Sequence, residues 1–169
     1  IEQLYRAVWS ELRDELLPFD QIRIINSVLF DKMKFKSNTK NFHSPGNSML
    51  NLVLESGKGN PISLCAIFLL IAQRLGLPVF GVNLPNLFIL SYKSEDTQFY
   101  INVFNRGLIF SRDDIDNYIS HLQLSPQDIY YEPCGHLEII IRFMRNLIVA
   151  FDKVGDYYKS DEVKALLQI

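Results

Sequence analysis

This sequence has few cysteines and a small net charge. Two cysteines in 169 residues, Cys65 and Cys134, are too few for a disulfide framework, which favours a reducing compartment and predicts a cytoplasmic protein. A net charge of −2 provides no basic surface for nucleic acid or an anionic membrane, so we expect neither as a partner. The longest apolar stretch, residues 62–75, is too short for a membrane span, which needs about 20 residues.

That apolar stretch instead predicts a helix inside a folded core. Asn60 is suited to cap it, Pro61 fits its first position, where no N–H is required, and Gly76 supplies the stop. Because the residues between are almost all apolar, we expect the helix to be buried on all sides. A hydrophobic content of 48% is enough for one core of ordinary size.

Three segments rich in β-branched and aromatic residues follow this helix. They are separated by the turn-forming pair Pro85-Asn86 and by residues 93–98, and they predict three consecutive antiparallel strands. The predicted strands are residues 79–84, 87–92 and 99–104.

Helical patterns flank this centre on both sides. Apolar residues recur at helical spacing over residues 1–33, interrupted at Leu17-Pro18, and predict an antiparallel helical hairpin whose second helix is capped by Asp20. The helices predicted behind the strands are residues 112–122, residues 137–154 and a last one that ends near Leu167.

We therefore expect a single α+β domain over residues 1–169. Its parts are a hairpin at 1–33, a core of helix and sheet at 44–122 and a helical tail at 126–169. We find no signal peptide, but the chain begins at Ile1 rather than Met, so we expect a preceding piece to be missing.

Several short segments, in the right order, carry a resemblance to a known family. The chain resembles the SirB1-type branch of the transglutaminase-like superfamily over residues 19–116 and, more loosely, throughout. The resemblance implies a papain-like core in which a buried helix packs on a small antiparallel sheet. The segments are residues 47–55 (NSMLNLVLE), 59–64 (GNPISL), 74–78 (RLGLP), 81–85 (GVNLP), 104–107 (FNRG) and 111–112 (SR).

The resemblance also locates the family's catalytic triad, and here the triad is degenerate. A nucleophilic Cys at the first helix position, a His at the start of the second strand and an Asp or Asn on the third fall on Pro61, Leu87 and Asn102. The Cys needs the helix N-terminus to stabilise its thiolate and the His to take its proton. Pro61 has no nucleophile and Leu87 no lone pair, so we expect no catalytic residues and a non-catalytic interaction or ligand-binding domain.

A cysteine-dependent amide hydrolase or transferase with a displaced nucleophile is the first alternative. Cys65 is the fallback nucleophile, although its apolar neighbours in the helix predict a hidden thiol of raised pKa. Cys134 stands two residues from His136, but two neighbouring ligands do not make a zinc site, so we expect no metal.

The second alternative is a small-molecule pocket in the cleft where active members of the superfamily have their catalytic site. Five amides offer donors and acceptors there without a base: Asn60, Asn83, Asn86, Asn102 and Asn105. Residues 57–60 (GKGN) lack the Walker pattern, and what remains is a helix N-terminus of the kind that tolerates anions. We expect no cofactor.

The end of the chain suggests the partner. Residues 146–159 (NLIVAFDKVGDYYK) resemble the first helix and turn of a tetratricopeptide repeat, with Gly155 at the turn. One such unit cannot bury its own apolar face. We therefore expect the C-terminal helices to contact the core, another protein or a second copy of this chain, while a plain helical hairpin explains the pattern equally well.

Overall fold

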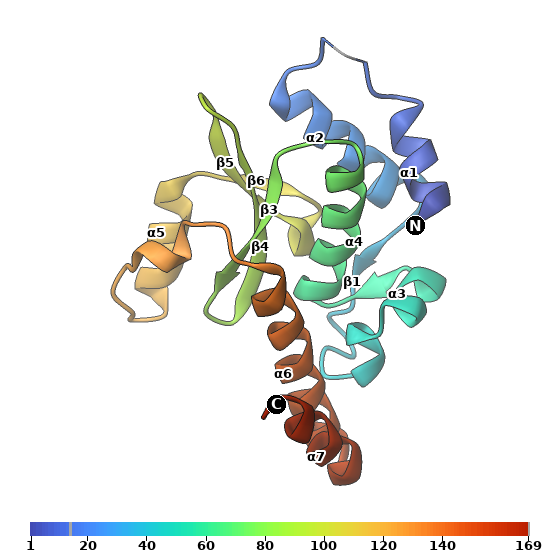
Figure 1. Ribbon diagram of the computed structural model, residues 1–169, viewed down its shortest axis with the longest axis vertical. Helices are drawn as coiled ribbons and strands as arrows, with labels where there is room; N and C mark the ends of the chain where they lie inside the picture. Colours follow the sequence, from blue (N-terminus) through green and yellow to red (C-terminus); the bar gives the residue numbers. More distant parts are fainter. Residues whose placement is uncertain (14, 169) are drawn as a thin grey trace.

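A four-stranded antiparallel sheet lies beside one long helix in the computed structural model, which describes residues 1–13 and 15–168 (Figure 1). The helix is α4 (Pro61–Arg74), and the fold is α+β, as predicted. The strands, in spatial order, are β3 (Val79–Leu84), β4 (Leu87–Lys93), β5 (Gln98–Asn102) and β6 (Leu108–Phe110).

Helix α4 begins and is buried as its sequence predicts. The side chain of Asn60 accepts a hydrogen bond from the backbone N–H of Ser63, and the Ser63 hydroxyl accepts one from the backbone N–H of Asn60. This reciprocal capping box satisfies two N–H groups at the start of the helix, and Pro61 at its first position has no N–H to satisfy. Most side chains from Pro61 to Ala72 are buried.

The two faces of the sheet serve different cores. Phe88, Leu90 and Tyr92 of β4 pack in the main core together with α4, whereas Leu87 and Ile89 pack in a second cluster. Alternation along a strand explains this division, because successive side chains point to opposite faces. Helix α5 (Arg112–His121) contributes buried isoleucines to the second cluster and therefore lies over the other face.

The three predicted antiparallel strands are confirmed, and the sheet has a fourth strand that the sequence analysis did not predict. The third predicted strand ends at Asn102 rather than residue 104, where the Asn102 side chain accepts a hydrogen bond from the N–H of Asn105 and starts a single 3-10 turn (Val103–Asn105). This local bond competes with strand pairing. The chain then reverses and adds β6 beside β5.

The front of the chain is less helical than predicted. Helix α1 (Glu2–Trp9) ends well before residue 16, and α2 (Pro18–Asn26) continues into a π-helical segment (Ser27–Lys32). Asp20 is not the cap of α2: the N-cap is Leu17, without a side-chain bond, because Pro18 already occupies the first helical position.

A segment without predicted structure connects this pair to α4. Strand β1 (Lys36–Ser37) pairs in parallel with β2 (Lys58–Gly59), and between them lie a 3-10 turn (Pro45–Ser48) and α3 (Leu50–Ser56). Buried Asn47 ties the loop together, since its amide group donates to the carbonyl oxygens of Asn41 and Phe42 and accepts from the side chain of Asn38.

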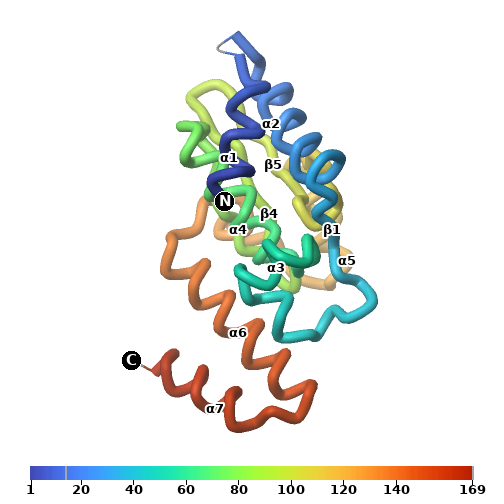
Figure 2. Tube along the Cα trace, turned by 90° about the vertical axis from the view of Figure 1, so that its right-hand side faces the viewer, coloured from blue at the N-terminus to red at the C-terminus, as the bar shows by residue number. Residues whose placement is uncertain are grey.

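The last two helices run away from the sheet, past the N-terminal end of α4 (Figures 1 and 2). They are α6 (His136–Val154) and α7 (Tyr157–Leu166), joined by Gly155 at a φ of +80°, and both match their predicted positions. A Cβ at Gly81 would lie 2.7 Å from the Phe88 ring and 3.1 Å from Cys134 Sγ, so the start of α6 packs closely on β3 because residue 81 is glycine. None of the described helices is long and apolar enough to cross a membrane.

Candidate binding cavity

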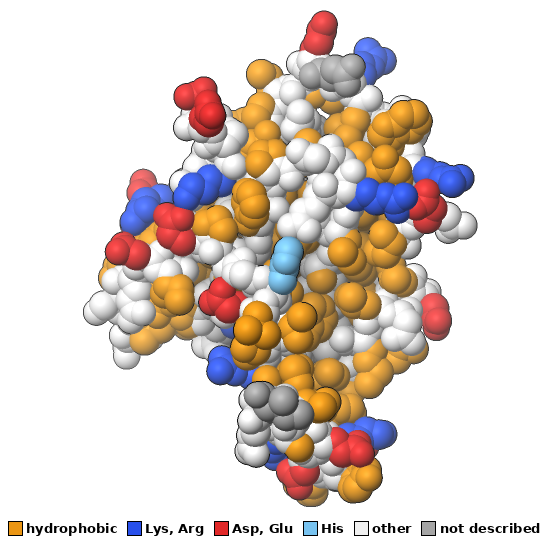
Figure 3. Space-filling model, viewed as in Figure 1, with side chains coloured by type: hydrophobic (Ala, Val, Ile, Leu, Met, Phe, Trp, Pro, Cys, Tyr) orange, Lys and Arg blue, Asp and Glu red, His pale blue; other side chains and the backbone are white. Residues whose placement is uncertain are grey.

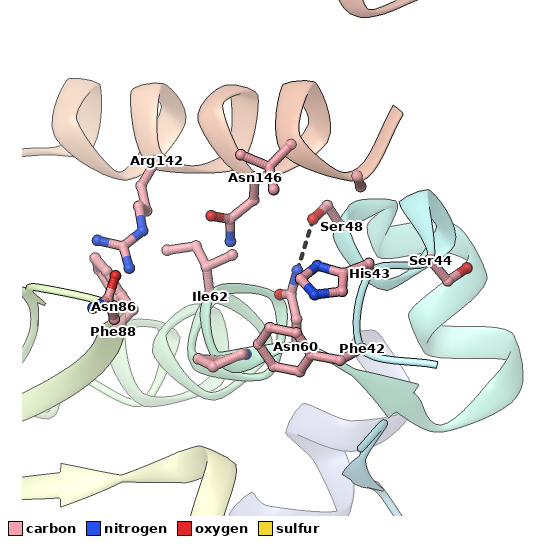
Figure 4. Close-up of a pocket in the computed structure, with 13 residues that line it drawn as sticks. Phe42, His43, Ser44, Ser48, Asn60, Ile62, Asn86, Phe88, Arg142 and Asn146 are labelled. Carbon is pink, nitrogen blue, oxygen red and sulfur yellow. Dashed lines mark hydrogen bonds between the residues drawn. The ribbon is translucent and has the colours of Figure 1, made fainter. Parts of the chain in front are cut away.

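A cavity of about 260 Å³ opens where four elements meet (Figure 4). Its walls are the first turn of α4, the tip of the β3–β4 hairpin, the loop that precedes α3 and the inner face of α6. The residues that line it are Phe42, His43, Ser44, Ser48, Asn60, Pro61, Ile62, Asn86, Phe88, Arg142, Asn146, Val149 and Ala150.

Asn60 anchors one wall of the cavity. Its side chain is 6% exposed, and its Nδ2 donates to Ser48 Oγ at 2.7 Å while its Oδ1 accepts from the Ser63 N–H at 3.0 Å. The same amide thus caps α4 and fixes the loop before α3. Pro61, next to it, also lines the cavity, and its side chain has no polar atom.

Arg142 forms the opposite wall. Its Nη1 donates to Asn83 Oδ1 at 2.6 Å and to the Leu84 carbonyl oxygen at 3.1 Å, which ties α6 to β3. The pKa of Arg142 is lowered from its ordinary value, mainly because the guanidinium is partly buried. The interaction with Tyr118 raises this pKa and the charge of Arg145 lowers it further. None of the carboxylates described in the structure forms an ion pair with this guanidinium.

The remaining lining is divided by polarity. Figure 4 shows Arg142 and Asn146 reaching from α6 toward Asn86 and the first turn of α4. Ile62, Phe88, Val149 and Ala150 supply apolar surface. No Asp or Glu of the described residues lines the cavity, and Arg142 contributes a positive charge to its wall.

The five predicted cleft amides do not all meet here. Asn60 and Asn86 line the cavity, and Asn83 reaches it only through its bond to Arg142. Asn102 and Asn105 are bonded to each other at the 3-10 turn after β5 and are not among the lining residues.

Of the three positions to which the resemblance assigns the triad, only one is among the residues that line the cavity. Pro61 lines the cavity, Leu87 packs in the second cluster on the other face of the sheet, and Asn102 is engaged with Asn105. Leu87 therefore packs against the second cluster and not in the wall of the cavity that Pro61 lines.

Both cysteines are free thiols of low acidity. Cys65 has no exposed surface, and burial raises the pKa of its thiol far above the usual value. Cys134 is partly buried, and burial, helped by the charge of Glu138, raises its pKa to about 11. Within the described part of the chain, no group of three His, Cys, Asp or Glu side chains could hold a metal ion.

Arg142 and Asn146 were absent from the sequence prediction. They stand four residues apart in a strongly apolar helix and so share one face of it. Two polar residues at that spacing among apolar neighbours are the signal that could have found them.

Comparison with known proteins agrees with this architecture. Residues 1–145 match the profile of the transglutaminase-like superfamily. The chain belongs to this superfamily. The matched region ends at Arg145, within α6, so that Arg142 lies inside it and Asn146 just beyond. No solved structure matches the chain significantly.

Relatives of the chain occur in bacteria and in mammals. A UPF0162 protein of Xylella fastidiosa is 33% identical over 129 residues, 73% of this chain and 46% of that protein. A UPF0162 protein of Pasteurella multocida is 31% identical over 102 residues, 60% of this chain and 39% of that protein. F-box only protein 21 of Mus musculus is 38% identical over 89 residues, 52% of this chain and 14% of that protein. The chain thus spans less than half the length of each.

Proposed function

We propose that this transglutaminase-like domain is non-catalytic and binds a ligand in the cavity beside α4. It belongs, in this proposal, to the SirB1-type branch and has lost the triad of its superfamily. The observation that carries the proposal is Pro61 at the first position of α4, because this residue lines the cavity but its side chain offers no nucleophile. A helix start is the place where a thiolate is best stabilised, so its replacement by proline removes the reaction at its source.

The surroundings of the two thiols support the same proposal. A displaced nucleophile must reach the substrate as a thiolate, and the raised pKa values of Cys65 and Cys134 oppose this. Neither cysteine lines the cavity. Two free thiols also fit a reducing compartment, and we keep the cytoplasm as the proposed location.

The same proposal assigns a protein contact to α6 and α7, which retain the tetratricopeptide-like interpretation. Several of their apolar side chains are exposed, and Figure 3 shows hydrophobic side chains extending from the region of α4 down over α6. We propose a second copy of this chain or another protein as the partner. The exposed side chains outside the cavity are Leu137, Ile140, Val154, Tyr157, Tyr158 and Leu166.

An activity assay with matched variants tests the central proposal. Ammonia release from a glutaminyl peptide, and incorporation of a primary amine into it, are measured before and after iodoacetamide treatment, with Cys65→Ser and Cys134→Ser in parallel. We expect no turnover in any sample. Turnover that iodoacetamide abolishes, and that one of the two serine variants lacks, would mean that a displaced nucleophile operates and that the proposal is wrong.

A further inference from the structure

The guanidinium of Arg142 lies at the cavity wall and is bonded there only to neutral acceptors among the described residues. It is half-buried at the cavity wall, and its bonds to Asn83 and to the Leu84 carbonyl use Nη1. Both of these acceptors are neutral, and no described carboxylate lines the cavity. A planar guanidinium has five N–H donors, so most of its hydrogen-bonding capacity is left for a further acceptor. A charge placed this way is costly to bury and gains most from an anion.

The rest of the cavity limits what that anion is. Ile62, Phe88 and Val149 form an apolar wall, which favours a ligand with a hydrocarbon part. Asn86 and Asn146 supply amide donors and acceptors, the complement of a peptide group. A compact, fully hydrated anion such as phosphate would leave the apolar wall unused.

From these contacts we infer that the cavity binds a carboxylate attached to an apolar body through or beside an amide, as in an acylated amino acid or the last residue of a peptide. The inference rests on the proposed binding function and names its ligand class. Arg142 pairs with the carboxylate, Asn146 with the amide, and the apolar wall with the side chain. A volume of about 260 Å³ suits one such residue.

Binding is measured by titrating the ¹⁵N-labelled protein in an NMR spectrometer with three probes. The probes are N-acetyl-L-leucine, its neutral analogue N-acetyl-L-leucinamide, and inorganic phosphate. We expect N-acetyl-L-leucine to bind at least about tenfold more tightly than either of the others, the factor that corresponds to one charge-assisted contact. A peptide that ends in leucine, with a free or an amidated C-terminus, then separates a small metabolite from a chain end as the source of the carboxylate.

Two variants of α6 and one control locate the contact. Asn146→Asp is nearly isosteric and places a carboxylate four residues from Arg142, where it pairs with the guanidinium and excludes the ligand. Arg142→Gln removes the charge, but it also removes bonds to β3 that stabilise the fold. Arg145→Gln is the matched control, because Arg145 is exposed on the same helix and does not line the cavity.

We expect Asn146→Asp and Arg142→Gln to lose at least tenfold in affinity for N-acetyl-L-leucine and Arg145→Gln to bind within about twofold of the parent. Asn146→Asp keeps the test valid if Arg142→Gln unfolds. Equal affinity for N-acetyl-L-leucine and its amide, tighter binding of phosphate, or unchanged binding by Asn146→Asp would each overturn the inference. Binding of the amide alone would overturn the charge assignment while leaving a ligand-binding cavity in place. Failure of all three probes to bind would also overturn the inference, whereas only thiol-dependent turnover overturns the non-catalytic proposal.

Discussion

The thiol of Cys65 donates a hydrogen bond to the carbonyl oxygen of Phe88, 3.4 Å away, and so joins α4 to β4. The same thiol has no exposed surface. Cys65 therefore acts as a packing residue between helix and sheet, on the main-core side of β4, which is where a buried free cysteine behaves as a small hydrophobe. Its chemistry is accessible only when this contact opens.

The first prediction concerns thiol labelling. With iodoacetamide at pH 8, we expect Cys134 to react slowly and Cys65 not to react until the protein unfolds, because both pKa values are raised and the thiolate is the reactive form. Peptide mass spectrometry of labelled samples, native and in urea, measures each site. Rapid labelling of native Cys65 would show that its thiol is not buried between α4 and β4.

The second prediction tests the burial of α4 directly. Cys65→Asp should unfold the domain, since it places an unpaired carboxylate in the main core. Cys65→Ala leaves only a small cavity and should fold, with a loss of about 1–3 kcal/mol. Circular dichroism during urea unfolding distinguishes the two. If Cys65→Asp unfolds at the same urea concentration as the parent, residue 65 does not lie in the main core.

The third prediction concerns the start of α4. Asn60→Ala removes the cap and leaves Ser48 without its partner, which should lower the free energy of unfolding by about 1–2 kcal/mol. Asn117→Ala is the matched control, because Asn117 is exposed within α5 and alanine favours the helix, so its effect should be below about 0.5 kcal/mol. Equal losses in both variants would show that the capping box does not stabilise the protein.

The fourth prediction examines the triad positions. A Pro61→Cys thiol should titrate below the roughly 8.5 of free cysteine, because the N-terminal end of α4 favours the thiolate. Adding Leu87→His should leave that pKa unchanged, since Leu87 faces the second cluster. In a separate double variant, adding Asn86→His to Pro61→Cys should lower the pKa of the thiol further at a pH where the imidazole is charged. The reason is that Asn86 and residue 61 line the same cavity.

Thiolate absorbance against pH measures all three variants. His also tolerates the left-handed backbone at position 86, where φ is +58°. A clear additional shift with Leu87→His, and none with Asn86→His, would contradict the placement of these side chains on opposite faces of the sheet.

The fifth prediction concerns self-association through α6. If a second copy covers the apolar face, sedimentation velocity should show a dimer whose fraction rises with protein concentration. Leu137→Glu combined with Ile140→Glu should abolish it, because both side chains are exposed in the single chain. Leu124→Glu, on an exposed loop, is the control. A protein that stays monomeric at millimolar concentration would exclude the second copy as partner.

Local sequence determined the elements whose signals lie within a few residues. Helix α4 starts at Asn60 and Pro61 because both signals operate within one helical turn. The Asn60 side chain caps the N–H of Ser63, and Pro61 has no N–H that needs a partner. Pro85 and Asn86 likewise turn the chain between β3 and β4, with Asn86 in the left-handed conformation. The sequence also shows a proline at residue 61, the position that the family resemblance predicts for the nucleophile.

Tertiary structure alone decided the short strands and the cavity. Strand β6 has three residues, and β1 and β2 have two each, so none carries a periodic pattern, and each exists only because a partner strand satisfies its backbone. Arg142 meets Asn83 across 59 residues of chain, through the packing of α6 on the sheet. Such contacts depend on how apolar faces combine in space, and local propensities do not specify that combination.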